Sequence, residues 1–321
     1  MDPWRPDDLL AIVERLGLPR PDVREPATLW VEGADGVRLR LLDWGGGGPP
    51  VLMLHGGALS ARTWDYVACA LRRSHRVLAL DMRGHGESEW TDEYAVDAMA
   101  ADAEAVVRSV AGGPVHAVGM SLGGLMAAEL ALRAPDLVLS LTLVDVGPGA
   151  AFEATARMRG FMGEVTGAPS AEAVVGAAMQ ISRLRDEARI RYRMQALLRQ
   201  DPDGLWRWRR DSRRATNFRE ILARVNALAD KAAAIPAPVL LVRGACSRSF
   251  PAPAATAFVA RLPDGRLREA AEAGHNVQED NPLALLGFLQ AFFAEVETKR
   301  AAPEDGPEQT PDLQMGQSTT A

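Results

Sequence analysis

Residues 115–134 constrain the fold of this 321-residue chain more than any other stretch. A short apolar run ends in the motif GMSLG at residues 119–123, and small residues at helical spacing follow directly. The pattern predicts a strand, a sharp turn with Ser121 at its apex, and a helix. Glycine is needed on both sides of the serine, because strand and helix come so close that a Cβ atom at either flank would collide.

Composition and charge limit the class of protein. Apolar residues make up 47% of the chain, which is ample for a buried core in one large domain or two. The net charge of -6 is modest and mixed in sign, so we expect neither nucleic acid nor a membrane as a partner. Cys69 and Cys246 cannot form a disulfide framework, and we interpret both as small buried or half-buried residues.

The chain shows no sign of a targeting segment or a metal site. It begins with MDPWRPDDLL, which has neither the basic nor the apolar region of a signal peptide, and no apolar run approaches about 18 residues. No set of Cys and His residues has zinc-ligand spacing. We therefore expect a soluble, cytoplasmic protein without metal or cofactor.

Short apolar runs alternate with helical patterns along most of the chain. Strands are expected at residues 28–31, 37–42, 51–54, 77–80, 115–118, 139–144, 239–242 and 266–270, and helices at about 7–16, 62–72, 95–110, 254–262 and 282–296, besides the one after Ser121. Unbroken apolar strands between helices predict an α/β fold with a mostly parallel sheet and helices on both faces. Such sheets place ligands at the carboxyl ends of their strands, where His55, Asp81 and Ser121 fall.

The strand pattern is interrupted between residues 151 and 234, where Arg, Met and aromatic residues are frequent. We interpret this stretch as an all-helical insertion. The predicted organisation is an N-terminal helix and extended lead-in over residues 1–27, a core formed by 28–148 and 235–297, a helical cap over 149–234, and a disordered tail over 298–321.

Four local motifs, in this order, resemble those of the α/β-hydrolase superfamily. They are HGG at residues 55–57, DMRGHGES at 81–88, GMSLGG at 119–124 and AGH at 273–275. The resemblance covers nearly all of residues 28–297 and is to members with a serine nucleophile and a helical lid. It implies an α/β-hydrolase fold, with a mostly parallel sheet, helices on both faces and an inserted helical cap.

The resemblance also implies roles for particular residues. Ser121 would be the nucleophile on its elbow, and His275 would be the base that takes the serine proton. The backbone N–H groups of Gly57 and Leu122 would form the oxyanion hole. The other histidines are interpreted as structural: His55, His75, His85 and His116. We interpret the loop that begins at Asp81 as structural as well.

The position of the acidic residue that would orient His275 departs from the commonest pattern of the family. In most relatives an Asp follows the next-to-last strand, but the corresponding loop here, GACSRSF at residues 244–250, contains no carboxylate. Some members place the acid after the sixth strand, which here is the position of Asp145. That strand should lie beside the one that carries Ser121, so a carboxylate at its tip can reach the loop of His275. Two alternatives stay open, in which Asp145 only caps a turn or a group other than a carboxylate orients the histidine.

Glu279 and Asp280 lie close to His275 in the sequence. We interpret them as caps of the helix that Pro282 opens. Neither Asp280 nor Ser247 is expected to influence the charge of the imidazole.

The resemblance implies a serine hydrolase that cleaves a carboxylic ester or lactone through an acyl-enzyme. Relatives that use an Asp nucleophile are excluded by Ser121. The apolar cap favours a small, largely apolar substrate, and we interpret the basic residues 207–210 and 213–214 as a solvated helix face. Acyl transfer or C–C bond hydrolysis by the same triad, or a non-catalytic ligand-binding or scaffold protein, are the alternatives. The oligomeric state stays open.

Overall fold

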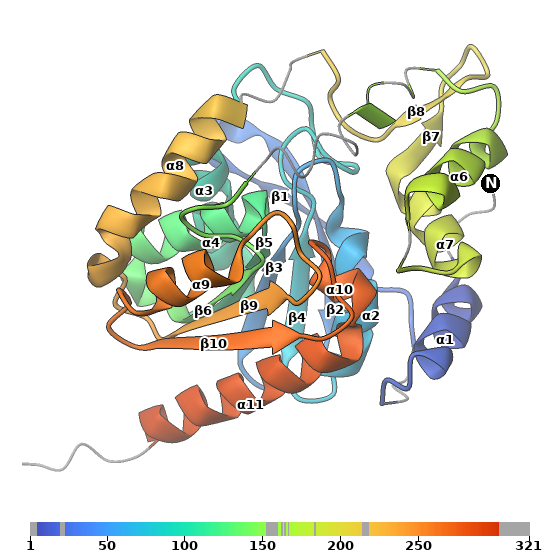
Figure 1. Ribbon diagram of the computed structural model, residues 1–321. Coiled ribbons are helices and arrows are strands. Elements are labelled where there is room, and N and C mark those ends of the chain that lie inside the picture. The colour runs from blue at the N-terminus through green and yellow to red at the C-terminus, as the bar shows by residue number, and fades with distance from the viewer. Residues whose placement is uncertain are drawn as a thin grey trace, which may run out of the picture.

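A mostly parallel sheet forms the centre of the molecule in the computed structural model (Figure 1). The structure describes residues 5–19, 23–151, 160–161, 163, 165, 167–182, 184–213 and 218–301. The strands of the sheet are β1 (Ala27–Glu32), β2 (Arg38–Gly45), β3 (Pro50–Leu54), β4 (Arg76–Leu80), β5 (Val115–Met120), β6 (Val138–Val144), β9 (Val239–Gly244) and β10 (Gly265–Ala270). They are hydrogen-bonded in the order β1-β2-β4-β3-β5-β6-β9-β10, antiparallel from β1 to β4 and parallel from β4 to β10.

Side chains from alternate strand residues enter two hydrophobic cores, one on each face of the sheet. Along β3, Val51 and Met53 enter one core, whereas Leu52 and Leu54 enter the other. The first face is covered by α2 (Asp65–Leu71) and α11 (Pro282–Ala301), and α1 (Pro6–Arg15) packs on α2. The second face is covered by α3 (Val96–Val106), α4 (Leu122–Arg133) and α9 (Ala252–Val259), and α8 (Phe218–Lys231) packs on α4. Burial on both faces is the reason why the central strands are unbroken apolar runs.

The α/β class and the mostly parallel sheet predicted from the sequence are confirmed. Each predicted strand lies within three residues of the observed bounds at both ends. Two helices have irregular ends that the periodicity did not indicate. The 3₁₀ turn Ala61–Trp64 leads into α2, and the π-helical turn Val107–Ala111 ends α3, where Gly112 takes a φ of 76°.

The insertion between β6 and β9 is not all-helical, contrary to the expectation from the sequence. After α6 (Ala171–Ile181) and α7 (Glu187–Leu197) comes an antiparallel hairpin of β7 (Leu198–Gln200) and β8 (Trp206–Trp208). Each hairpin strand has three residues, too few for an alternating pattern to be recognised. Gly204 in the connecting turn has a φ of 80°, a conformation that glycine adopts without strain.

Helix α8 lies apart from the rest of the insertion. It packs on α4, and its Val225 and Leu228 are buried in the core on that face of the sheet. In contrast, α7 packs beside α1, and α6, α7 and the hairpin lie together on the other side of the view in Figure 1. The stretch predicted as one cap, residues 149–234, therefore divides between two places in the molecule.

The last helix is longer than predicted. α11 ends at Ala301, so the first residues of the predicted tail, 298–301, are helical. Lys299 supports this last turn, because its Nζ atom donates to Glu295 one turn earlier and its charge suits a helix C-terminus. The remainder of the predicted tail, residues 302–321, lies outside the described residues. Across the described part of the chain, no helix combines the length and apolar character needed to cross a membrane.

A polar cluster attaches α11 to the sheet at the amino ends of β4 and β5. The Nε2 atoms of His75 and His116 lie 2.9 and 3.2 Å from the same Oε1 atom of Glu297. Their Nδ1 atoms lie 2.8 and 2.7 Å from the hydroxyl oxygens of Ser74 and Ser140. Burial lowers the pKa of His116 to about 4, although the hydrogen bond with Glu297 acts in the opposite direction. His116 is therefore neutral at pH 7.

The neutral state of His116 predicts a loss of stability in mild acid. In the unfolded chain a histidine has a pKa of about 6.5, so between pH 6.5 and pH 4 the unfolded chain binds a proton that the folded chain excludes. Between pH 7 and pH 5 the loss from His116 is on the order of 2 kcal/mol of unfolding free energy. Urea unfolding of the wild type and His116→Asn at the two pH values measures it. The variant should lose less stability on acidification, and an equal loss in the two proteins would contradict the prediction.

Candidate active site

Ser121 occupies the turn between β5 and α4 in a strained backbone conformation. Its φ of 52° and ψ of -116° lie outside the regions that L-residues ordinarily adopt. A Cβ atom on Gly119 would lie 2.2 Å from the carbonyl oxygen of Gly123, and one on Gly123 would lie 2.2 Å from the carbonyl oxygen of Leu54. The two glycines are thus required for the steric reason that the sequence suggested. The turn leaves Ser121 partly exposed at the carboxyl edge of the sheet.

His275 and Asp145 meet at the same edge. Asp145 follows β6 with a φ of 53°, and its side chain is buried, whereas His275 follows β10 and keeps 26% of its side chain exposed. The Nδ1 atom of His275 lies 2.7 Å from Oδ2 of Asp145. A carboxylate can only accept, so Nδ1 carries the proton and Nε2 is left as an acceptor.

The carboxylate of Asp145 has two further donors, one from the last residue of β9 and one from the loop that follows this strand. The backbone N–H of Gly244 donates to Oδ1 at 3.1 Å, and the hydroxyl of Ser247 donates to Oδ2 at 2.5 Å. Ser247 was expected not to influence the charge of the imidazole, but the structure places its hydroxyl on the same carboxylate oxygen that accepts from His275. The alternative in which Asp145 only caps a turn is not what the structure shows, since its carboxylate bonds to none of residues 146–148.

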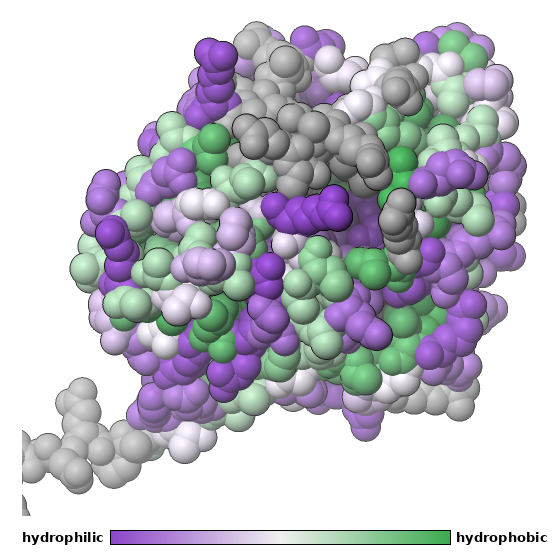
Figure 2. Space-filling view, in the orientation of Figure 1, coloured by the Kyte–Doolittle hydropathy of each residue, from purple (hydrophilic) through white to green (hydrophobic). Residues whose placement is uncertain are grey.

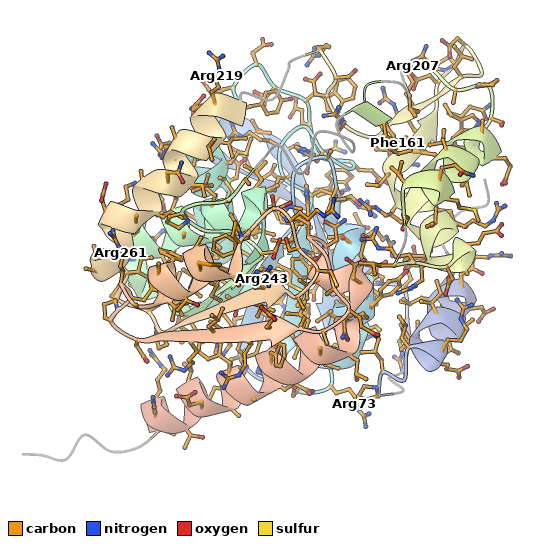
Figure 3. The ribbon with its side chains drawn as sticks, in the orientation of Figure 1. Arg73, Phe161, Arg207, Arg219, Arg243 and Arg261 are labelled. Atoms are coloured by element: carbon orange, nitrogen blue, oxygen red, sulfur yellow. The ribbon has the colours of Figure 1, made fainter. Side chains whose placement is uncertain are left out.

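Arg243 holds this loop in shape. Its guanidinium lies near the carboxyl end of β9 (Figure 3), where Nε donates to the carbonyl oxygen of Phe250 at 2.7 Å and Nη2 to that of Ser247 at 3.2 Å. Nη1 pairs with Glu269 at 2.6 Å. Residues 244–250 contain no carboxylate, but they donate hydrogen bonds to the carboxylate of Asp145, which follows β6. The role of Arg243 was not predictable from the sequence, because this residue belongs to no recognisable motif.

The predicted capping roles of Glu279 and Asp280 are wrong. Asn281 caps α11, since its Oδ1 accepts from the backbone N–H of Ala284 at 3.0 Å. Asp280 instead accepts from the N–H of Gly274 at 2.9 Å, which fixes the residue before His275.

Glu279 and Asp280 also form ion pairs with arginines of the insertion. Arg185 lies 2.7 Å from Asp280 and 3.3 Å from Glu279, and Arg193 of α7 lies 2.9 Å from Glu279. Burial by itself raises the pKa of Glu279, but the nearby arginines and the hydrogen bond from Thr63 together outweigh it and hold that pKa below its ordinary value. These ion pairs connect the insertion to the segment that carries His275.

Gly57 and Leu122 lie next to each other beside the elbow. A Cβ atom on Gly57 would lie 3.8 Å from the side chain of Leu122. Within the described residues, neither backbone N–H donates to a protein acceptor. His55 holds the adjoining loop, since its Nδ1 lies 2.8 Å from the carbonyl oxygen of Gly56 and its Nε2 accepts from the N–H of Met82. Burial lowers the pKa of His55 to about 4, so its role here is that of a neutral, structural group.

The structure brings Ser121, His275 and Asp145 to one edge of the sheet, but the contacts among them differ. His275 and Asp145 are hydrogen-bonded. Between the hydroxyl of Ser121 and the ring of His275 no hydrogen bond is formed in the described structure.

A cavity of about 280 Å³ opens beside the elbow. Its lining comes from the core and from the segment after β8, and it includes Gly57, His85, Tyr94, Leu122, Arg210 and Asp211. On the face shown in Figure 2, hydrophilic and hydrophobic residues are mixed around the central hollow. A cavity of this size fits a small ligand rather than a long chain.

The basic residues 207–210 do not form a solvated helix face, contrary to the expectation. Arg207 lies on β8 and pairs with Asp203 at 2.7 Å. Arg209 lies 3.5 Å from Glu87 of the core. The expectation failed because each strand of the hairpin is too short for its period to be distinguished from a helical one.

One cluster in the described part of the chain groups three potential metal ligands: His75, His116 and Glu297. It lies at the amino ends of the strands, opposite the elbow, and its ring nitrogens already have protein partners. Cys69 is buried as expected, but Cys246 is exposed, contrary to the expectation.

The chain is similar to known proteins in both sequence and structure. A family model described as the alpha/beta hydrolase fold matches residues 49–282. Esterase Rv0045c of Mycobacterium tuberculosis is 36% identical over 281 residues, which cover 82% of this chain and 89% of that protein. Its crystal structure matches with a TM-score of 0.73 at 32% identity, over 92% of this chain and 99% of that one. A sn-1-specific diacylglycerol lipase of Mus musculus is 28% identical over 267 residues, or 79% of this chain and 84% of that protein.

The steric role of the elbow glycines gives a direct prediction. Gly123→Ala should destabilise the fold by about 3 kcal/mol or more, because the new Cβ meets backbone atoms of β3 that cannot rotate away. Gly176→Ala is the matched control, since this exposed position in α6 has no atom within 4 Å of the new Cβ, and alanine there should stabilise by up to about 1 kcal/mol. Urea unfolding midpoints measure both changes. Similar midpoints for the two variants would show that the structure around residue 123 accommodates a Cβ atom.

Proposed function

Since this chain belongs to the alpha/beta hydrolase family and is a carboxylic ester hydrolase, we propose that it cleaves a small ester or lactone through an acyl-enzyme on Ser121. The observation that carries the proposal is the 2.7 Å contact between His275 and the buried Asp145, beside a strained serine at the end of β5. A buried carboxylate on Nδ1 leaves Nε2 free to accept a proton, which is the state that a general base needs.

The proposed reaction begins when Nε2 of His275 takes the proton of the Ser121 hydroxyl and the serine oxygen attacks the ester carbonyl carbon. The carbonyl oxygen becomes negative in the tetrahedral intermediate and accepts hydrogen bonds from the N–H groups of Gly57 and Leu122. His275 then gives its proton to the alcohol oxygen as the C–O bond breaks. A water molecule repeats the sequence on the acyl-enzyme and releases the acid.

Asp145 has two tasks in this proposal. It keeps the proton of His275 on Nδ1, and it stabilises the positive imidazolium that exists after proton transfer. The donors Gly244 and Ser247 fix the carboxylate at the required angle. Because Ser247 approaches the same oxygen as His275, we propose that it positions Asp145 without touching the substrate.

We further propose that the insertion up to residue 213 forms a lid, with α8 as part of the core. The cavity supports this division, since Gly57 and Leu122 line it from the core and Arg210 and Asp211 line it from the segment after β8. Tyr192 of α7 also donates to the buried Asp65 of α2 at 2.5 Å, which anchors the proposed lid.

The first prediction concerns the nucleophile. A fluorophosphonate probe should label the wild type on Ser121 and should leave Ser121→Ala unlabelled, since the probe forms a bond only with an activated hydroxyl. Ser109→Ala, which removes an exposed hydroxyl on α3's final turn, is the control and should label like the wild type. Labelling that persists in Ser121→Ala, or its absence in folded wild type, would favour a non-catalytic binding protein.

A second prediction separates the roles around the imidazole. Asp145→Asn should lower kcat by at least about a hundredfold, because the amide favours the wrong histidine tautomer. Ser247→Ala should lower kcat by about tenfold with little change in KM, the value of one hydrogen bond to a charged group. Steady-state kinetics on one neutral ester measures both, with Ser109→Ala as control.

The predictions for Asp145→Asn and Ser247→Ala can be contradicted separately. Full activity in Asp145→Asn would mean that the acid lies elsewhere. If Ser247→Ala were the more damaging of the two, a hydroxyl rather than a carboxylate would orient His275.

A further inference from the structure

Arg210 stands out from the basic residues around it. Within the described residues its guanidinium has neither an ion pair nor a hydrogen bond, and its Nε atom is buried without an acceptor. Arg207 and Arg213, by contrast, each pair with a carboxylate at 2.7 Å. Arg210 is therefore a positive charge without a counter-charge in this part of the chain.

The backbone around Arg210 is fixed to the core. The N–H of Gly86 donates to the carbonyl oxygen of Arg209 at 2.8 Å, and the N–H of Asp211 donates to that of Gly84 at 2.7 Å. Between these two bonds, Arg210 forms an antiparallel bridge with His85. The side chain thus starts from a rigid position.

From this position Arg210 lines the same cavity as Gly57 and Leu122, the proposed oxyanion donors. Its neighbour His85 cannot compensate a positive charge. Burial lowers the pKa of His85 to about 3, and Arg210 itself contributes to that shift, so the imidazole is neutral.

A guanidinium stays charged at any physiological pH, so even the partial burial of Arg210 without a counter-charge is unfavourable. Burial lowers the pKa of Arg210, and no carboxylate opposes this change. An anion that enters the cavity would relieve the penalty. The planar fork of arginine fits a carboxylate with two parallel hydrogen bonds.

The cavity also has acidic lining residues, which already have partners. Asp211 is bound by Arg213 and by the hydroxyl of Tyr94, and Glu93 accepts from the N–H of Ala95. Asp92 and Glu220 interact with other groups as well. None of the four pairs with Arg210, which leaves its charge available to a ligand.

We propose that Arg210 binds a free carboxylate on the substrate, so that the enzyme prefers small esters that carry a second, negatively charged acid group. The inference rests on the ester hydrolysis proposed above and deepens it. It also replaces the expectation of a largely apolar substrate, because that expectation counted apolar cap residues and could not show which arginine lacked a partner.

The test compares small charged esters with neutral counterparts that have a similar carbon chain. Monomethyl glutarate carries the carboxylate on its acyl side, with dimethyl glutarate as its neutral counterpart, and O-acetyl glycolate carries it on its alcohol side, with ethyl acetate as counterpart. Acid release in a pH-stat gives kcat/KM for each. We expect the wild type to favour one charged ester over its neutral counterpart by at least about tenfold.

The variants assign this preference to one side chain. Arg210→Gln should lose at least about tenfold on the favoured charged ester, mainly through KM, and stay within about threefold on the neutral ones. Arg210→Lys should retain part of the preference for the charged ester, since lysine keeps the positive charge but lacks the planar guanidinium that donates two parallel hydrogen bonds. Arg209→Gln, whose Glu87 pair is exposed, is the matched control and should keep the preference. A wild type that favours the neutral esters, or equal losses for Arg210→Gln on both kinds, would overturn the proposal.

Binding without turnover separates this proposal from the proposed function. Glutarate should bind Ser121→Ala measurably in calorimetry and should bind the double variant with Arg210→Gln at least about tenfold more weakly. If no ester is hydrolysed but this difference is found, the anion site stands and the proposed reaction fails. If neutral esters are hydrolysed and glutarate binds both variants equally, the reaction stands and the role of Arg210 is wrong.

Discussion

The buried carboxylate of Asp145 joins three parts of the chain that lie far apart in sequence. It projects from the end of β6 and accepts from His275 after β10. It also accepts from the backbone of Gly244 at the end of β9 and from Ser247 in the loop that follows. A carboxylate in a buried position is strongly unfavourable unless its oxygens are satisfied, and here each oxygen has a donor. The need to satisfy this one group fixes the loops at the carboxyl edge of the sheet.

A second set of buried charges connects the insertion to this edge. Glu279 and Asp280 are paired with Arg185 and Arg193, while Asp280 also holds the backbone of Gly274. Buried pairs of this kind add little net stability, but loss of one partner leaves an uncompensated charge. Their effect is therefore one of geometry. The insertion and the loop of His275 cannot move independently without exposing or separating these charges.

Much of the fold was predictable because it depends on local patterns. The central strands are buried on both faces and read as apolar runs, and the glycines beside Ser121 mark a close approach that any chain with this turn must satisfy. The hairpin of β7 and β8 was missed because three-residue strands have no measurable period. The place of α8 was missed because an amphipathic helix shows that one face is buried but not against which partner.

By itself, the sequence determined the α/β class, the strained turn at Ser121 and the position of His275 after the last strand, because sterics and periodicity act between residues that are near in the chain. Only the tertiary structure decided that Asp145 meets His275 at 2.7 Å and that Ser247 shares the same carboxylate. It alone distinguished Arg210, which has no partner among the described residues, from the paired Arg207. The reason is physical: whether a charge is compensated depends on the distance to groups many residues away, and that distance is set by packing.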